Sequence, residues 1–253
     1  MADCNPMPTP LEISKHGYSQ HQYSSQEIRN FPYTEVVGCL VYLSTKTRPD
    51  ISFATNYVSR YRGNPKGEDL VNVKRILRYL QGTKNLGLLF PSTSSPGVVC
   101  YTDSDFAGSG PEFKMMSTSG YVIYVGGGPV VWLSKKQDVV ATSVCEAEYI
   151  AAATCCKNLQ YLKSFLYELI CEQVPASVKI DNACALRLIK TGQMRTGTKH
   201  ILVKFYFISE ALRSGMFRIS HCPSKDNIAD IFTKPLLVNK FKYFCSKLVT
   251  SNL

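Results

Sequence analysis

The chain has 253 residues, of which 45% are hydrophobic and 19% are charged. This composition suits one large domain or two small ones and excludes a chain that is disordered throughout. The formal net charge of +10 at pH 7 favours nucleic acid as a partner over an acidic small molecule. No signal peptide and no apolar run of about 18 residues is found, so the sequence predicts a soluble intracellular protein without a membrane partner, in the cytoplasm or the nucleus.

Ten cysteines are spread along the chain without a CxxC pair, and several of them, such as Cys39, Cys100 and Cys155, lie in apolar segments. This distribution favours buried free thiols over a disulfide framework. A zinc site that uses His221 and Cys222 is an alternative, although adjacent residues rarely ligate one ion and no second pair has suitable spacing.

The first part of the chain is predicted to be helical. Residues 1–30 are polar and rich in Ser, Gln and Pro, so we expect a poorly ordered leader. Between residues 31 and 90, apolar residues recur at helical spacing in three segments, and Pro49 is placed to start the second helix. The basic residues of these helices either bind along a nucleic acid or are simply solvated. The three predicted helices cover residues 32–44, 48–61 and 68–82.

The segment PSTSSPG at residues 91–97 is predicted to be a linker to a second domain over residues 98–237. Residues 97–103 are predicted to form a strand, followed by a hairpin around a Gly-Gly-Gly-Pro turn. A long helix, a strand, two helices, a strand and a short helix follow, and residues 238–253 form a tail or a helix. This order predicts an α/β fold with a mixed five-stranded sheet flanked by helices.

Acidic residues occur where this order would bring elements together: at the end of the first strand, near the start of the long helix, at the end of the fourth strand and in the final helix. Two-metal phosphodiester hydrolysis requires such a cluster, because two ions about 3.5–4 Å apart must activate water and stabilise the leaving oxygen. Carboxylate oxygens are hard ligands that suit Mg²⁺ or Mn²⁺.

Several segments, in this order, resemble the ribonuclease H domain of copia-type LTR-retrotransposon Pol polyproteins: YTDSDFAG, STSGYVIYVGGGPVVWLSKKQ, SVCEAEYIAA, KIDNACAL, TKHI and NIADIFTKPL. The upstream segments PYTEVVGCLVYLSTKTRPDISFA and VKRILRYLQGTKNLGLLF resemble the end of that family's reverse transcriptase, its thumb and connection. The resemblance extends from about Pro6 to Leu236. It implies a ribonuclease H-like fold and a nuclease that cuts the RNA strand of an RNA–DNA hybrid with two Mg²⁺ or Mn²⁺ ions and no small-molecule cofactor.

The resemblance also implies which residues are catalytic and bind the metal ions. Matched position by position, they are Asp103, Glu148, Asp181 and Asp230.

A protein that accepts hybrids of any sequence is expected to bind phosphates and 2′-hydroxyls rather than base edges. Each side chain predicted to do so could equally be solvated, and His221 is either an auxiliary group for proton transfer or product release or a structural residue. The predicted substrate contacts are Lys135, Lys136, Gln137, Asn182 and Lys199.

Two of the four carboxylates have a neighbouring competitor. Glu146 and Glu148 are about 200° apart around a helix, so both cannot face one site. Ser143 and Glu146 fit an S-x-x-E capping box, which leaves Glu148 as the ligand. Asp103 and Asp105 share one face of a strand. We expect Asp103 to close the strand as the ligand, and Asp105 to belong to the following turn.

Other interpretations of these residues remain open. Asp181 could cap the helix that begins at Ala183, and Asp226 or Asp230 could interact with the dipole of the last helix. No Tyr/Phe-x-Asp-Asp motif occurs, so no DNA synthesis is expected. The chain looks like a polyprotein fragment, or an open reading frame from a truncated genomic copy, that begins at a chance Met1, and the rest of a reverse transcriptase polyprotein is its expected partner. The alternative function is a catalytically inactive remnant with a nucleic-acid-binding or structural role.

Overall fold

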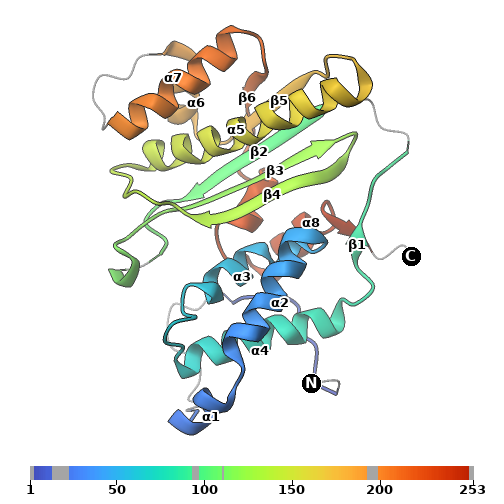
Figure 1. Cartoon of the computed structure of the whole chain (residues 1–253), viewed down its shortest axis with the longest axis vertical. Helices are drawn as coiled ribbons and strands as arrows, with labels where there is room; N and C mark the ends of the chain where they lie inside the picture. Colours follow the sequence, from blue (N-terminus) through green and yellow to red (C-terminus); the bar gives the residue numbers. More distant parts are fainter. Residues whose placement is uncertain (1–2, 13–22, 93–96, 110, 193–198, 251–253) are drawn as a thin grey trace. The chain divides into compact units, whose positions relative to one another are not determined.

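The computed structural model describes residues 3–12, 23–92, 97–109, 111–192 and 199–250. The chain divides into two compact units, a helical unit formed by Met1–Leu89 with Pro235–Leu253 and a sheet unit formed by Phe90–Lys234 (Figure 1). In the part of the chain that the structure describes, no helix is both long and apolar enough to cross a membrane.

The sheet unit is built on five strands in the spatial order β4-β3-β2-β5-β6. β3 pairs antiparallel with both β2 and β4, whereas β5 runs parallel to β2 and β6 runs parallel to β5. The predicted mixed five-stranded sheet is therefore confirmed. The strands are β2 (Val98–Asp105), β3 (Thr118–Val125), β4 (Gly128–Lys136), β5 (Ala176–Ile180) and β6 (Arg218–His221).

The hairpin between β3 and β4 turns through two glycines. Gly126 and Gly127 have φ values of 55° and 80°, a region of backbone space that glycine enters without steric cost. Two residues with positive φ give the turn that matches the twist of the flanking strands. The predicted glycine turn thus connects β3 to the edge strand β4.

Three helices of the sheet unit lie on one side of the sheet, as Figure 1 shows: α5 (Val144–Ile170), α6 (Ala183–Thr191) and α7 (Lys199–Arg213). α5 packs on the sheet through small buried residues, including Ala152 and Ala153. Small side chains allow close contact between helix and sheet, so this face forms the hydrophobic core. The thiols of Cys100 and Cys155 are buried in it, as the sequence predicts, whereas Cys39 is exposed and contradicts the expectation of a buried thiol.

The predicted final helix is instead a short 3-10 helix, η3 (Ile228–Phe232). Asn227 attaches its start to the central strand, because its buried side-chain amide donates to the Thr102 carbonyl at 3.0 Å. η3 packs on the sheet face opposite α5, next to Gly120. A Cβ atom at Gly120 would lie 2.6 Å from Thr233 Cγ2 and 2.7 Å from Phe232 Cβ, so this close packing requires glycine.

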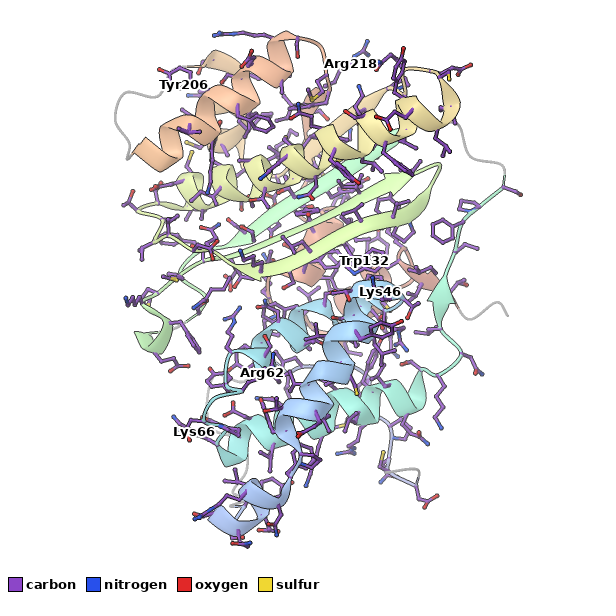
Figure 2. All side chains as sticks on the ribbon, viewed as in Figure 1. Lys46, Arg62, Lys66, Trp132, Tyr206 and Arg218 are labelled. Carbon is purple, nitrogen blue, oxygen red and sulfur yellow. The ribbon has the colours of Figure 1, made fainter. Side chains whose placement is uncertain are left out.

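The helical unit contains the three predicted helices, and Pro49 starts a short 3-10 helix that leads into the second of them. Residues 235–253 join this unit through a further helix and a short strand pair. Lys46, Arg62 and Lys66 are among its exposed basic residues (Figure 2). Its elements are α1 (Ser25–Asn30), α2 (Tyr33–Lys46), η1 (Pro49–Ile51), α3 (Ser52–Ser59), α4 (Gly67–Gly82), β1 (Gly87–Leu88), α8 (Val238–Cys245) and β7 (Val249–Thr250), and the sheet unit also contains the 3-10 helix η2 (Pro111–Phe113).

Part of the predicted leader packs on α4. Thr9 and Leu11 are buried, and Arg75 of α4 pairs with Glu12 at 3.0 Å. This ordered contact differs from the poorly ordered leader expected for residues 1–30, because an apolar and a hydroxyl side chain cover the helix. The domain boundaries proposed from the sequence stay predictions.

Substituting Gly120 with alanine is expected to destabilise the sheet unit. The added methyl group collides with η3, and overpacking of this kind costs about 1–3 kcal/mol of unfolding free energy. Urea denaturation of Gly120→Ala measures the loss. Gly97→Ala is the matched control, since a Cβ there meets nothing within 4 Å, and equal stability of the two variants would contradict the packing described for η3.

A buried ion pair in the helical unit gives a second stability prediction. Arg48 Nη2 lies 2.7 Å from Asp50 Oδ2, and Tyr79 donates to the same oxygen at 2.7 Å. Arg48→Met leaves the buried Asp50 carboxylate without its cation, which is expected to lower the unfolding free energy by about 3–5 kcal/mol. Arg62→Met removes an exposed arginine and is expected to change it little; equal losses would refute the importance of the pair.

Candidate metal centre

Three carboxylates from three elements converge near the carboxyl ends of the parallel strands β2 and β5. Asp103 lies in β2, Glu148 in the second turn of α5, and Asp181 directly after β5. Each offers one oxygen, and these oxygens lie within 4.8 Å of one another. Among the residues that the structure describes, this is the one group of His, Cys, Asp or Glu side chains with such spacing, so the alternative zinc site finds no support.

The sheet topology explains why these residues meet. β2 and β5 are parallel neighbours in which Thr102 pairs with Ile180. The next residues along the two strands, Asp103 and Asp181, therefore lie side by side. α5 packs on β2 and β3 and supplies Glu148 from its second turn.

The Glu148 carboxylate is buried and is held by the backbone of β2. Its Oε1 accepts a hydrogen bond from the Ser104 backbone N–H at 3.2 Å. Its Oε2 is buried and has no hydrogen-bond partner among the described residues. A buried carboxylate oxygen without a partner is costly, and a divalent cation among hard oxygen ligands would satisfy it. The residues present therefore fit a Mg²⁺ or Mn²⁺ ion.

The pKa values of the group reflect the same crowding. Burial raises the pKa of Asp103 to about 7, with Lys234 opposing and Asp230 adding to the shift. Burial, together with the charges of Asp103 and Asp181, raises the pKa of Glu148 to about 9. Bringing ionised carboxylates together away from water is unfavourable, so the group favours either protons or a bound cation.

Asp230 is not part of the three-carboxylate group but shares Lys234 with Asp103. Its Oδ1 is 2.7 Å from Lys234 Nζ, which lies 3.5 Å from Asp103 Oδ2. Thr233 also donates to Asp103 Oδ2. Although burial acts in the opposite direction, the charges of Asp103 and Asp230 raise the pKa of Lys234 above its usual range.

The sequence interpretation overlooked three residues that shape this site: Lys234, Thr233 and Asn227. Two of them had local signals. Lys234 follows Asp230 by four positions, the spacing at which opposite charges meet on a helix. Asn227 directly precedes an apolar run, which is a helix-start signal. Nothing in the sequence pointed from Thr233 to Asp103, since 130 residues separate them.

Glu146 takes the structural position expected of it, with one difference. Ser143 caps α5 and accepts the Glu146 N–H at 3.2 Å. The Glu146 carboxylate accepts from the Thr142 N–H at 2.7 Å rather than from Ser143. The reciprocal half of the predicted capping box is therefore absent, because the carboxylate reaches one residue further back. Glu146 lies outside the three-carboxylate group.

The reason given for distinguishing Asp103 from Asp105, the position of the strand end, was wrong. β2 continues through Asp105, which pairs with Thr118, so Asp103 does not close the strand. The two residues differ in burial, because Asp103 is 2% exposed whereas Asp105 is half-buried. Asp105 faces the next turn, where a Cβ atom at Gly108 would lie 1.8 Å from Asp105 Oδ2.

Two predicted site residues lie beside Asp181. Asn182 is the N-cap of α6, and its Oδ1 accepts the Ala185 N–H at 2.9 Å. The capping role considered for Asp181 thus belongs to Asn182. The exposed His221 side chain lies with Nε2 3.1 Å from the Asp181 carbonyl oxygen, next to the group but not within it.

The remaining predicted substrate contacts differ in accessibility. Lys135 is exposed and pairs with Asp138 at 3.0 Å, and Lys136 lies over the Phe113 ring at 4.7 Å. Gln137 is buried, and its amide donates to Ser119 and Ala147. Its donors are thus used within the fold, which contradicts a direct substrate contact. Lys199 is the first residue of α7, and its side chain lies outside the described residues.

Comparisons with known proteins identify the family. No family model matches the chain. The chain is 36% identical over 250 residues to the retrovirus-related Pol polyprotein from transposon RE1 of Arabidopsis thaliana and 38% identical over 253 residues to that from transposon TNT 1-94 of Nicotiana tabacum, and each match covers 98% of the chain.

The chain spans less than a fifth of these relatives, 17% and 19% of their lengths. Among solved structures, LC11-RNase H1, isolated from compost by a metagenomic approach, is similar with a TM-score of 0.41 and 21% identity, over 55% of this chain and 94% of that chain. From the sequence relatives, the chain belongs to the family of copia-type retrotransposon Pol polyproteins.

Proposed function

We propose that this chain is a ribonuclease H that hydrolyses the RNA strand of RNA–DNA hybrids with divalent cations. The observation that carries the proposal is the convergence of Asp103, Glu148 and Asp181, with a buried Glu148 oxygen that no described residue satisfies. Membership of a retrotransposon Pol family supports the substrate class, because such elements copy RNA into DNA and pass through a hybrid.

The proposed centre uses two ions, Mg²⁺ or Mn²⁺. Asp103, Glu148 and Asp181 would hold the first, and Asp230 would join Asp103 in holding the second. When bound, such ions lower the pKa of coordinated water and stabilise charge on the phosphate that is attacked. All four carboxylates come from elements fixed by the sheet and its two covered faces, so the ligands are held in place before any ion binds.

Other residues of the chain orient these ligands. The Ser104 N–H holds Glu148, and the Thr233 hydroxyl holds Asp103. His221 touches the Asp181 carbonyl and is exposed, so we assign it the auxiliary role of exchanging a proton with solvent beside the third carboxylate.

The hybrid is proposed to extend from the carboxylates toward the end of β4. Asp105 pairs with Thr118, and Thr118 pairs with Lys136, which places Lys136 two strands, about 10 Å, from Asp105. The exposed ion pair of Lys135 with Asp138 is weak in water and can be exchanged for a phosphate. Asn182 and Lys199 are proposed as further contacts from α6 and α7.

The helical segment at residues 31–90 is proposed to be the end of a reverse transcriptase, its thumb and connection. The rest of the polyprotein is the proposed partner, and a cytoplasmic particle or the nucleus the proposed location. These assignments rest on the family and not on the geometry of the carboxylates.

The nuclease proposal predicts metal-dependent cleavage of a labelled RNA–DNA hybrid. Asp103→Asn and Asp181→Asn are each expected to reduce the cleavage rate by at least about 100-fold, because each removes a charged oxygen ligand. Asp226→Asn is the matched control, since Asp226 lies four residues before Asp230 and outside the group. Hybrid binding that weakens with salt, without cleavage by the folded wild type in Mg²⁺ or Mn²⁺, would favour the inactive remnant instead.

The raised pKa values link stability to pH when no metal is present. In the unfolded chain Asp103 and Glu148 titrate near pH 4, whereas in the folded protein burial raises their pKa values to about 7 and about 9. The folded state thus binds more protons between these limits. Its stability is greatest at the acidic end of the window and falls as the pH rises through the folded pKa values.

We therefore expect the unfolding free energy in EDTA to fall by several kcal/mol between pH 5 and pH 8, and Mg²⁺ to restore part of it. Urea denaturation at several pH values measures the slope. Glu148→Gln is expected to flatten it, whereas Asp226→Asn is expected to keep it. An unchanged slope in Glu148→Gln would show that the buried carboxyl does not govern the effect.

A further inference from the structure

The second cation position of the proposed centre already contains a cation of the protein. Lys234 Nζ lies between the carboxylates of Asp230 and Asp103, 2.7 Å from Asp230 Oδ1 and 3.5 Å from Asp103 Oδ2. The three-carboxylate group leaves out Asp230. Asp103 therefore faces two places for positive charge, one toward Glu148 and Asp181, the other toward Asp230.

We propose that Lys234 excludes the second metal ion until nucleic acid binds. In the free protein the ammonium group occupies the position between Asp103 and Asp230, and only one divalent ion binds. When a hybrid is bound, Lys234 moves to a backbone phosphate, and the second ion enters. The inference rests on the proposed function, because it assumes that these carboxylates hold divalent ions.

The position of Lys234 is set by the local backbone. The Lys234 N–H donates to the Asp230 carbonyl at 3.3 Å, directly after η3. Lys234 follows Asp230 by four residues, and this turn brings its side chain within reach of the Asp230 carboxylate. The pairing thus follows from the fold of η3 and needs no contact from the helical unit.

Electrostatic repulsion prevents the Lys234 ammonium group and a divalent ion from occupying the position between Asp103 and Asp230 at the same time. A divalent ion that shared Asp103 and Asp230 with the ammonium would stand beside a like charge in a largely desolvated place, since Asp103 and Asp230 are 2% and 1% exposed. Repulsion between charges at contact distance is strong where water is excluded. The ion on the side of Glu148 and Asp181 does not compete, because Lys234 contacts neither residue in any described interaction.

Lys234 is also able to leave. Its side chain is 37% exposed, whereas those of its two partners are 3% and 2% exposed. A lysine has a flexible stem and a compact charge that binds phosphate readily. The polyanionic backbone of a hybrid gives it an alternative anion near the carboxylates, so substrate binding and entry of the second ion become coupled.

The test counts Mn²⁺ ions bound to the purified full chain, by isothermal titration calorimetry and by electron paramagnetic resonance of free Mn²⁺. Wild type is expected to bind one ion alone and two with a duplex of DNA and 2′-O-methyl RNA, which lacks the free 2′-hydroxyl and keeps the phosphates. Lys234→Met is expected to bind two ions in both conditions. Lys225→Met, which removes an exposed lysine from the preceding loop, is the matched control and is expected to behave as wild type.

A second variant protects the test if Lys234→Met folds poorly. Asp230→Asn keeps the lysine but weakens the second ion's ligands, and is expected to bind one ion with or without the duplex. Two ions on free wild type, or one on folded Lys234→Met in both conditions, would overturn the role of Lys234 and leave the nuclease proposal standing. If wild type and the control bind no ion in either condition, the metal centre itself is refuted.

Discussion

The constraint on which the sheet unit depends is the mutual repulsion of carboxylates that two parallel strands and a helix bring together. Asp103 and Asp181 are adjacent because β2 and β5 are paired in register, and Glu148 is added from α5. Desolvation and like charge both oppose the ionisation of Asp103 and Glu148. Such a group is stable only if protons, a lysine or metal ions offset the negative charge, and Lys234 and the Ser104 N–H each offset part of it.

On the sheet face opposite α5, η3 and the residues after it help to offset the negative charge of the carboxylates. η3 carries Asp230 and is followed at once by Thr233 and Lys234. It reaches Asp103 because Gly120 has no side chain and because Asn227 binds the Thr102 carbonyl. A larger residue in the middle of β3 would push η3 outward and move the lysine away from Asp103. The close packing of η3 on Gly120 therefore determines where Lys234 can pair with Asp103.

Much of this arrangement could be predicted from the sequence, and the exceptions have physical causes. Alternating and helical apolar patterns predicted the strands and helices in their order, since burial determines both. The strand end at Asp105 was missed because pairing with β3 extends the strand beyond its apolar run. Gln137 was misinterpreted because the same polar side chain suits solvent or the buried Ser119. Thr233 was overlooked because its partner Asp103 is distant in sequence.

The net charge of the site relates Lys234 to the proposed binding of a second divalent ion. Four ionised carboxylates with one ammonium group and one divalent ion leave a single negative charge at the site. Replacing the ammonium with a second divalent ion, while one phosphate of the substrate enters, leaves the same single negative charge. The proposed exchange would therefore not accumulate charge in a desolvated place, where accumulated charge is most costly. A lysine that bridges Asp103 and Asp230 offsets part of the carboxylate charge within the chain itself.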